Sequence, residues 1–305
     1  MQGRKLLALA AMAAVIAVPS AQAHSQSAPG WKVVASGLDN PRGIAIAKNG
    51  DLWIAEAGKG GTEHCAAGPE GGAQCFGASG AFTRVHNGEQ KRVVTGLPSV
   101  ADQGSPDGTG AGQSAVGPSD VVVNGDHVTG LIGGAAADPE TRTLYGPAAA
   151  LSGSIVKIDP WKGTVWPFAD LLAYEAANNP DLATNPKAVV DSDPNGIAQV
   201  HGGFVVAEAA GNDLLSVDYH KHISTLATFA PVTIPAGPFG PPGTTLDYEA
   251  VPTTVAVRPK DPNYYVGQLT GFPFPANAAN VYKVTPGNAT PTVYASGFTT
   301  IIDMA

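Results

Sequence analysis

Two glutamates in a repeated tripeptide, together with one asparagine, are the residues of this sequence best suited to hold a cation. Ala-Glu-Ala occurs around Glu56 and again around Glu208, and Asn195 follows a proline shortly before the second copy. Carboxylate and amide oxygens are the ligands of hard cations such as Ca²⁺. A divalent cation held there would polarise a carbonyl group or activate water, which is the chemistry of a hydrolase or lactonase. Alternatively, both glutamates are structural and accept backbone hydrogen bonds at strand ends.

A second set of polar residues occupies repeated positions that suit ligand binding. Arg42, Ser119, Asp120 and Thr253 each follow a proline by one or two residues, and Gln268 corresponds to the repeated glutamates. The sequence has no Gly-x-Ser-x-Gly motif and no evident Ser/His/Asp set, so a nucleophile paired with a base is not indicated. These residues favour noncatalytic binding of a small molecule, a glycan or an extracellular protein. Whether the chain is an enzyme stays open.

An internal repeat must position these residues. Four proline-led segments begin similar units, and each is followed by three further short apolar segments. The proline-led segments are 40–46, 117–123, 193–198 and 251–257; the second segments are 52–57, 127–133, 204–209 and 264–269. The third segments are 81–85, 154–158, 214–218 and 281–284; the fourth are 92–96, 164–168, 224–229 and 292–296. Four strands per unit predict an all-β fold, a β-propeller of four-stranded blades.

The two ends of the sequence indicate an incomplete propeller. Residues 31–38 resemble the fourth segments of the repeat, so we expect an outer strand that closes the ring against the last blade. Residues 299–305 resemble an innermost strand without the rest of its blade. We therefore expect four blades and one strand here, from a complete protein of five or six blades, six being preferred, with its last blade or two missing.

The lengths of the connections predict which face of the propeller binds ligands. Links on one face are long, whereas the turns on the other face span only a few residues. The long links are 58–80, 97–117, 134–153, 169–193, 230–251 and 270–280. Long loops on a rigid scaffold usually carry the binding surface. One of these links should contain a short helix near 168–178, ended by Asn178-Asn179-Pro180.

The N-terminal residues indicate export. Arg4 and Lys5 precede a short apolar run, and Ala21-Gln22-Ala23 provides small residues for cleavage, so residues 1–23 read as a signal peptide. The mature domain, 24–305, has no further long apolar stretch, so we expect a secreted or periplasmic protein without a membrane anchor.

Charge and cysteine content limit the partners. The net charge of −8 and the absence of a basic stripe disfavour nucleic acid. Cys65 and Cys75 lie in one glycine-rich segment, and in an exported chain they predict a disulfide.

Several segments together resemble the ScyD/ScyE family of exported propeller proteins. They are 55–58, 117–120, 174–180, 211–215, 266–275 and 297–303. The resemblance implies a six-bladed propeller related to NHL-repeat and SMP-30-like proteins, and an association with gene clusters for scytonemin pigment biosynthesis. It assigns no catalytic residues. Gln268 stands where the resemblance implies a glutamate.

Overall fold

The computed structural model describes residues 30–67, 72–104 and 110–305. Residues 35–305 form one compact unit, and of the preceding unit only residues 30–34 are described, without helix or strand. The signal peptide predicted over residues 1–23 lies outside the described residues. No helix in the described ranges combines the length and the apolar character needed to cross a bilayer.

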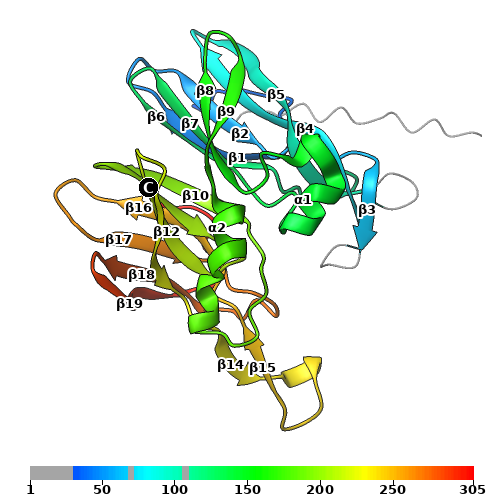
Figure 1. Cartoon of the computed structure of the whole chain (residues 1–305), viewed down its shortest axis with the longest axis vertical. Helices are drawn as coiled ribbons and strands as arrows, with labels where there is room; N and C mark the ends of the chain where they lie inside the picture. The colour runs from blue at the N-terminus through cyan, green and yellow to red at the C-terminus, as the bar shows by residue number, and fades with distance from the viewer. Residues whose placement is uncertain (1–29, 68–71, 105–109) are drawn as a thin grey trace, which may run out of the picture. The chain divides into compact units, whose positions relative to one another are not determined.

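The described part of residues 35–305 contains four successive antiparallel sheets of four or five strands, here called blades 1 to 4, and one smaller two-stranded sheet (Figure 1). Blade 1 comprises β1 (Pro41–Ile46), β2 (Leu52–Glu56), β4 (Ala73–His86) and β5 (Glu89–Asp102), with β3 (Glu63–Ala67) added beside β4. Blade 2 comprises β6 (Pro118–Asn124), β7 (His127–Ile132), β8 (Ser154–Asp159) and β9 (Thr164–Asp170). Blade 3 comprises β10 (Pro194–Val200), β11 (Gly203–Glu208), β12 (Asp213–Asp218) and β13 (Ile223–Thr228). Blade 4 comprises β16 (Pro252–Val257), β17 (Tyr264–Gln268), β18 (Ala279–Thr285) and β19 (Asn288–Phe298).

The blades pack against one another through their innermost strands and through shared apolar cores. Each of β1, β6 and β10 contacts the innermost strand of the next blade. Trp53 and Phe82 of blade 1 lie in one buried cluster with Val156 of blade 2, and the blade 2–3 and blade 3–4 junctions contain equivalent clusters. Sequential four-stranded blades joined in this way are the architecture of a β-propeller, which confirms the predicted fold class.

A glycine makes the packing of blades 1 and 2 possible. Gly130 lies in the middle of β7, directly against the ring of Phe82 in β4. A Cβ atom at position 130 would overlap that ring. The missing side chain therefore leaves the space into which Phe82, which is fully buried, inserts from the neighbouring blade.

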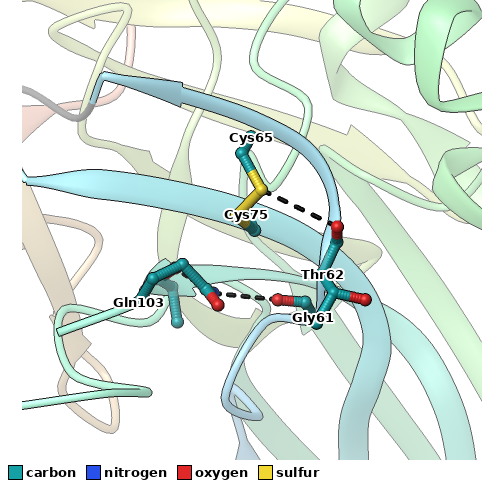
Figure 2. Close-up of a disulfide and its surroundings, with 6 residues drawn as sticks. Gly61, Thr62, Cys65, Cys75 and Gln103 are labelled. Carbon is teal, nitrogen blue, oxygen red and sulfur yellow. Dashed lines mark hydrogen bonds between the residues drawn. A yellow bond between two sulfur atoms is a disulfide. The ribbon is translucent and has the colours of Figure 1, made fainter. Parts of the chain in front are cut away.

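Blade 1 differs from the prediction because part of its long link is a sheet extension. Residues 58–80 were expected to form a loop, but β3 and the first half of β4 pair as a hairpin there, and β5 continues to Asp102. The hairpin brings Cys65 and Cys75 together in the predicted disulfide (Figure 2). Beside it, Gln103 donates to the carbonyl of Gly61 at 2.8 Å. A long loop with few apolar residues thus gains its order from backbone pairing and a cross-link.

The other long links contain short elements. They are α1 (Pro139–Tyr145), η1 (Gly146–Ala149), α2 (Leu171–Asn178), η2 (Pro180–Ala183), β14 (Val232–Pro235), η3 (Gly237–Phe239) and β15 (Thr245–Tyr248). The predicted short helix is α2. Asp170 caps its N-terminus by accepting a hydrogen bond from the Ala173 amide at 2.9 Å, and Asn179, in the left-handed region, ends it.

Neither terminal segment forms the strand that the sequence predicts. Residues 31–38 have no strand, and residues 299–305 have none either. Ile301 nevertheless lies beside blade 4, where its amide donates to the Gln268 carbonyl at 3.1 Å and its side chain packs near Tyr265. A strand exists only where a ladder partner exists, so sequence similarity to a strand is insufficient at these positions.

Candidate functional site

The innermost strand of each blade begins with a proline that is followed by a break in strand register. The breaks lie between Pro41 and Ile44, Pro118 and Asp120, Pro194 and Gly196, and Pro252 and Thr254. Such bulges redirect side chains out of the regular alternation. The residue after each proline is therefore free to face the space between blades. These residues are Arg42, Ser119, Asn195 and Thr253, and all of them line one cavity of about 300 Å³.

Arg42 brings a positive charge to this cavity. Its guanidinium donates to the Ala115 carbonyl at 2.7 Å, but the side chain is otherwise exposed. The Ser119 and Thr253 hydroxyls are instead engaged with backbone: Ser119 donates to the Pro194 carbonyl at 2.9 Å, and Thr253 donates to the Ile301 carbonyl at 2.6 Å. Arg42 and Asn195 are thus the proline-following residues best placed to meet a ligand.

Asp120, which sequence analysis named as a candidate, contributes a carboxyl group to the cavity. It accepts hydrogen bonds from the amides of Ile197 at 2.9 Å and Val121 at 2.7 Å, linking blade 2 to blade 3. Desolvation raises the pKa of Asp120 to about 7, in spite of these two bonds, and the Asp303 charge acts in the same direction. A carboxyl group that titrates near neutrality in a cavity is a recurring property of functional sites.

Two further carboxyl groups, which sequence analysis did not identify as candidates, also line the cavity. Asp193 accepts a hydrogen bond from the Gly134 amide at 2.8 Å; burial raises its pKa, whereas the Arg42 charge lowers it. Asp303 accepts from the Thr254 hydroxyl at 3.2 Å. Asp193 directly precedes a repeat proline, so its position was a usable signal. Asp303 lies in segment 299–305, which resembles an innermost strand in sequence but forms no regular structure, and it was not named as a candidate.

The residues at the ends of the second strands lie elsewhere. Glu56, Glu208 and Gln268 each pair with a repeat proline, yet none of them lines the cavity. Their side chains are buried within the blades. Gln268, for example, accepts hydrogen bonds from the Asn280 amide and side chain, both at 3.1 Å.

The candidate metal ligands Glu56, Asn195 and Glu208 are not brought together at the cavity, because only Asn195 lines it. Glu56 forms a salt bridge with Arg92 at 2.7 Å and accepts a bond from the Thr83 hydroxyl, so its charge is already compensated. In residues 30–67, 72–104 and 110–305, no group of at least three His, Cys, Asp or Glu side chains is arranged to hold a metal ion. These three residues do not fit an axial cation site.

Comparisons with known proteins find similarity at a low level only. No protein-family model matches the chain, and no curated protein matches it. A gluconolactonase from Xanthomonas campestris has a similar structure, with 13% identity and a TM-score of 0.45, over 89% of this chain and 67% of that one. A luciferin-regenerating enzyme is similar at 12% identity and a TM-score of 0.41, over 87% and 67% of the two chains.

A PQQ-bound aldose sugar dehydrogenase from Streptomyces coelicolor is also similar, at 16% identity and a TM-score of 0.35, over 87% of this chain and 84% of that one. This chain therefore spans about two thirds of two of these structures and most of the third.

Proposed function

We propose that this chain is an exported β-propeller of the ScyD/ScyE type that binds a small hydroxyl-rich molecule, such as a sugar or sugar acid, without transforming it. The observation that carries the proposal is the cavity at the innermost strands, which is lined by Arg42, Asp120, Asn195 and Asp303. A guanidinium, an amide and carboxyl groups offer both donors and acceptors to ligand hydroxyls. The cavity volume is at the lower end of the range of small-molecule sites.

The test is a binding screen by calorimetry with simple sugars, aldonic acids and their lactones. We expect at least one of them to bind, and we expect Arg42→Gln to weaken that binding about tenfold, as for a lost charge-assisted hydrogen bond. Lys91→Gln is the matched control, because Lys91 is an exposed cation on the outer strand β5. The proposal is wrong if no compound binds, or if both variants bind as the wild type does.

A metal-independent hydrolase or lactonase is the second candidate function, and one observation favours it. Asp120, whose pKa lies near 7, shares the cavity with Arg42, so a general base and a cation for a developing oxyanion are both present. A divalent-metal mechanism through Glu56, Asn195 and Glu208 is not supported by their arrangement.

Lactone hydrolysis as a function of pH would distinguish the two functions. A base with a pKa near 7 predicts a rate that rises up to about pH 7 and then levels, and Asp120→Asn should remove most of the rate. If the wild-type protein hydrolyses no lactone while it binds one, the binding function stands alone.

A further inference from the structure

Four buried carboxyl groups, here called the carboxyl cluster, lie where the link that follows blade 2 meets blade 3. Glu175 and Asp181 belong to this link, in α2 and η2, whereas Glu208 ends β11 and Asp213 begins β12. Each of the four residues is at most 2% exposed. Glu208 and Asp213 are direct partners in the β11–β12 ladder, so their side chains leave the sheet on the same face. The link is thus packed onto blade 3 through groups that can ionise.

Several oxygens of the carboxyl cluster lack a hydrogen-bond donor among the described residues. They are Glu175 Oε2, Glu208 Oε1 and both carboxyl oxygens of Asp213. Glu175 and Glu208 also face the same small space, because a Cβ atom at Gly211 would lie 2.8 Å from Glu208 Oε2 and 3.1 Å from Glu175 Oε2. A buried carboxylate needs donors or a cation to replace its lost hydration. The missing donors therefore favour the protonated form of these groups.

The charged groups around the carboxyl cluster do not supply a cation. They are further carboxyl groups: Asp191 acts on Glu175, Glu249 acts on Asp181, and Asp193 acts on Glu208. Asp213 is affected by the other three members of the cluster. In residues 30–67, 72–104 and 110–305, none of the four members forms a salt bridge. Each ionisation in the cluster thus adds negative charge next to other acidic groups.

The hydrogen-bond donors that the cluster does have are neutral amides. In the amide orientation that gives Asn179 two acceptors, its nitrogen donates to Asp181 Oδ1 at 2.9 Å and to Glu175 Oε1 at 3.0 Å. The Asn212 side chain donates to Asp181 Oδ2 at 3.4 Å, and the Gly211 amide donates to Glu208. Amides bind neutral and ionised carboxyl groups alike, but they bring no net positive charge. Repulsion between ionised members would therefore stay uncompensated.

We propose that the carboxyl cluster is a pH-sensitive switch: protonation keeps residues 175–185 of the link on blade 3, and ionisation releases them. The release would begin after the first turn of α2, because Leu171 and Leu172 are fully buried there. Tyr174 also holds that turn, through a hydrogen bond of 3.0 Å between its hydroxyl and that of Thr225. No member of the cluster lines the cavity described above, so the inference does not rest on the proposed function.

Burial sets the direction of the switch. Desolvation raises the pKa of Asp181 to about 6 and the pKa of Glu175 to about 8, and it raises the pKa values of Glu208 and Asp213 well above their usual range. The stability contributed by such acids is complete below about pH 4 and is lost as the pH rises through the folded-state pKa. The link should therefore be held near pH 5 and should loosen progressively above about pH 6.

The test measures denaturant unfolding of the whole chain between pH 5 and pH 9, with a chelator present throughout. We expect the wild-type midpoint to fall as the pH rises from 6 to 9. Glu175→Gln and Asp213→Asn keep the shape of the protonated side chains, so both variants should lose less and should exceed the wild-type midpoint at pH 9. Glu89→Gln, which removes an exposed carboxylate of β5, is the matched control and should follow the wild type.

Hydrogen exchange, corrected for its intrinsic dependence on pH, locates the release. Exchange of residues 175–185 in the wild type should accelerate by about tenfold or more between pH 6 and pH 9, whereas exchange in β7 should not. The inference is overturned if residues 175–185 exchange equally at both pH values, or if Glu175→Gln and Asp213→Asn accelerate as the wild type does. If Asp213→Asn does not fold, Asp181→Asn takes its place and the same two outcomes decide.

Discussion

Glu56 and Glu208 occupy equivalent places in blades 1 and 3, but their surroundings give them different chemistry. Each ends a second strand and pairs with a repeat proline. Glu56 meets the Arg92 guanidinium, whereas Glu208 meets the Gly211 amide and lies near other carboxyl groups. Burial opposes ionisation of Glu56, but bonds from Arg92 and Thr83 outweigh it and lower its pKa. Burial raises the pKa of Glu208 well above its usual value.

We expect Glu56→Gln to destabilise the fold by about 2 kcal/mol at pH 7, because Arg92 loses its buried partner. The lowered pKa of Glu56 makes this contribution present above about pH 4.5 and lost as the pH falls through the folded-state pKa. The difference between variant and wild type should therefore shrink towards pH 3. Denaturant unfolding at several pH values measures it, with Glu89→Gln as control. An equal difference at pH 7 and pH 3 would contradict this account.

At the residue scale, the sequence was informative where the repeat fixes the backbone. The positions after the repeat prolines, which include Arg42, Ser119 and Thr253, line one cavity, and their role in ligand binding stays a prediction. The direction of the glutamate side chains was not predictable, because it depends on Arg92 and Thr83, which belong to strands distant in sequence.

The helix α2 shows how a connecting element is held. Asp170 accepts a bond from the Ala173 amide and also forms a salt bridge with Arg142 at 2.9 Å. Leu171 and Leu172 anchor the first turn in the protein interior. The element is thus tied to the α1 segment at its N-terminus and buries Glu175 near its end.

Substitutions of Asp170 should distinguish the stability contributed by the helix N-cap from that contributed by the salt bridge with Arg142. We expect Asp170→Ala to cost about 1 kcal/mol, because the helix loses its N-cap, and Asp170→Asn to cost less, because asparagine also caps. Equilibrium unfolding of both variants gives the comparison. Equal losses in the two variants would show that the salt bridge, rather than the cap, provides the stabilisation.

At the element scale, prediction succeeded for short strands bounded by turn residues and for α2, whose capping residues are explicit. It failed for β3, since residues 63–67 are all exposed and have no alternating apolar pattern. That strand exists because β4 extends beside it and the disulfide joins them. Pairing of this kind depends on a partner rather than on local sequence.

The molecule as a whole depends on how closely successive blades approach. Gly130 and Phe82 set this approach between blades 1 and 2. We expect Gly130→Ala to destabilise the fold by about 1–3 kcal/mol, because the new methyl group requires the buried ring to move. Phe82→Leu combined with Gly130→Ala should cost less than the sum of the single substitutions. Denaturant unfolding tests this coupling, and additive losses would exclude it.

At the same scale, the four-blade organisation was predictable because each blade repeats one order of strands and turns. The location of the cavity was predictable but its full set of lining residues was not, because Asp193 and Asp303 lie outside the regular strands. The buried carboxyl groups of Glu175, Asp181, Glu208 and Asp213 were not predictable as a cluster, because they belong to α2, η2 and the adjoining ends of β11 and β12.

The break in register after each repeat proline has a consequence for the diversification of this scaffold. Backbone pairing resumes beyond each bulge, so the identity of the residue after the proline is not dictated by strand formation. Each blade thus contributes one such residue to the lining of the same cavity: Arg42, Ser119, Asn195 and Thr253. Changing Arg42 or Asn195, while the prolines are kept, would alter what the cavity recognises and leave the strand pairing intact. Ser119 and Thr253 are less free to change, because their hydroxyls also bond to neighbouring backbone.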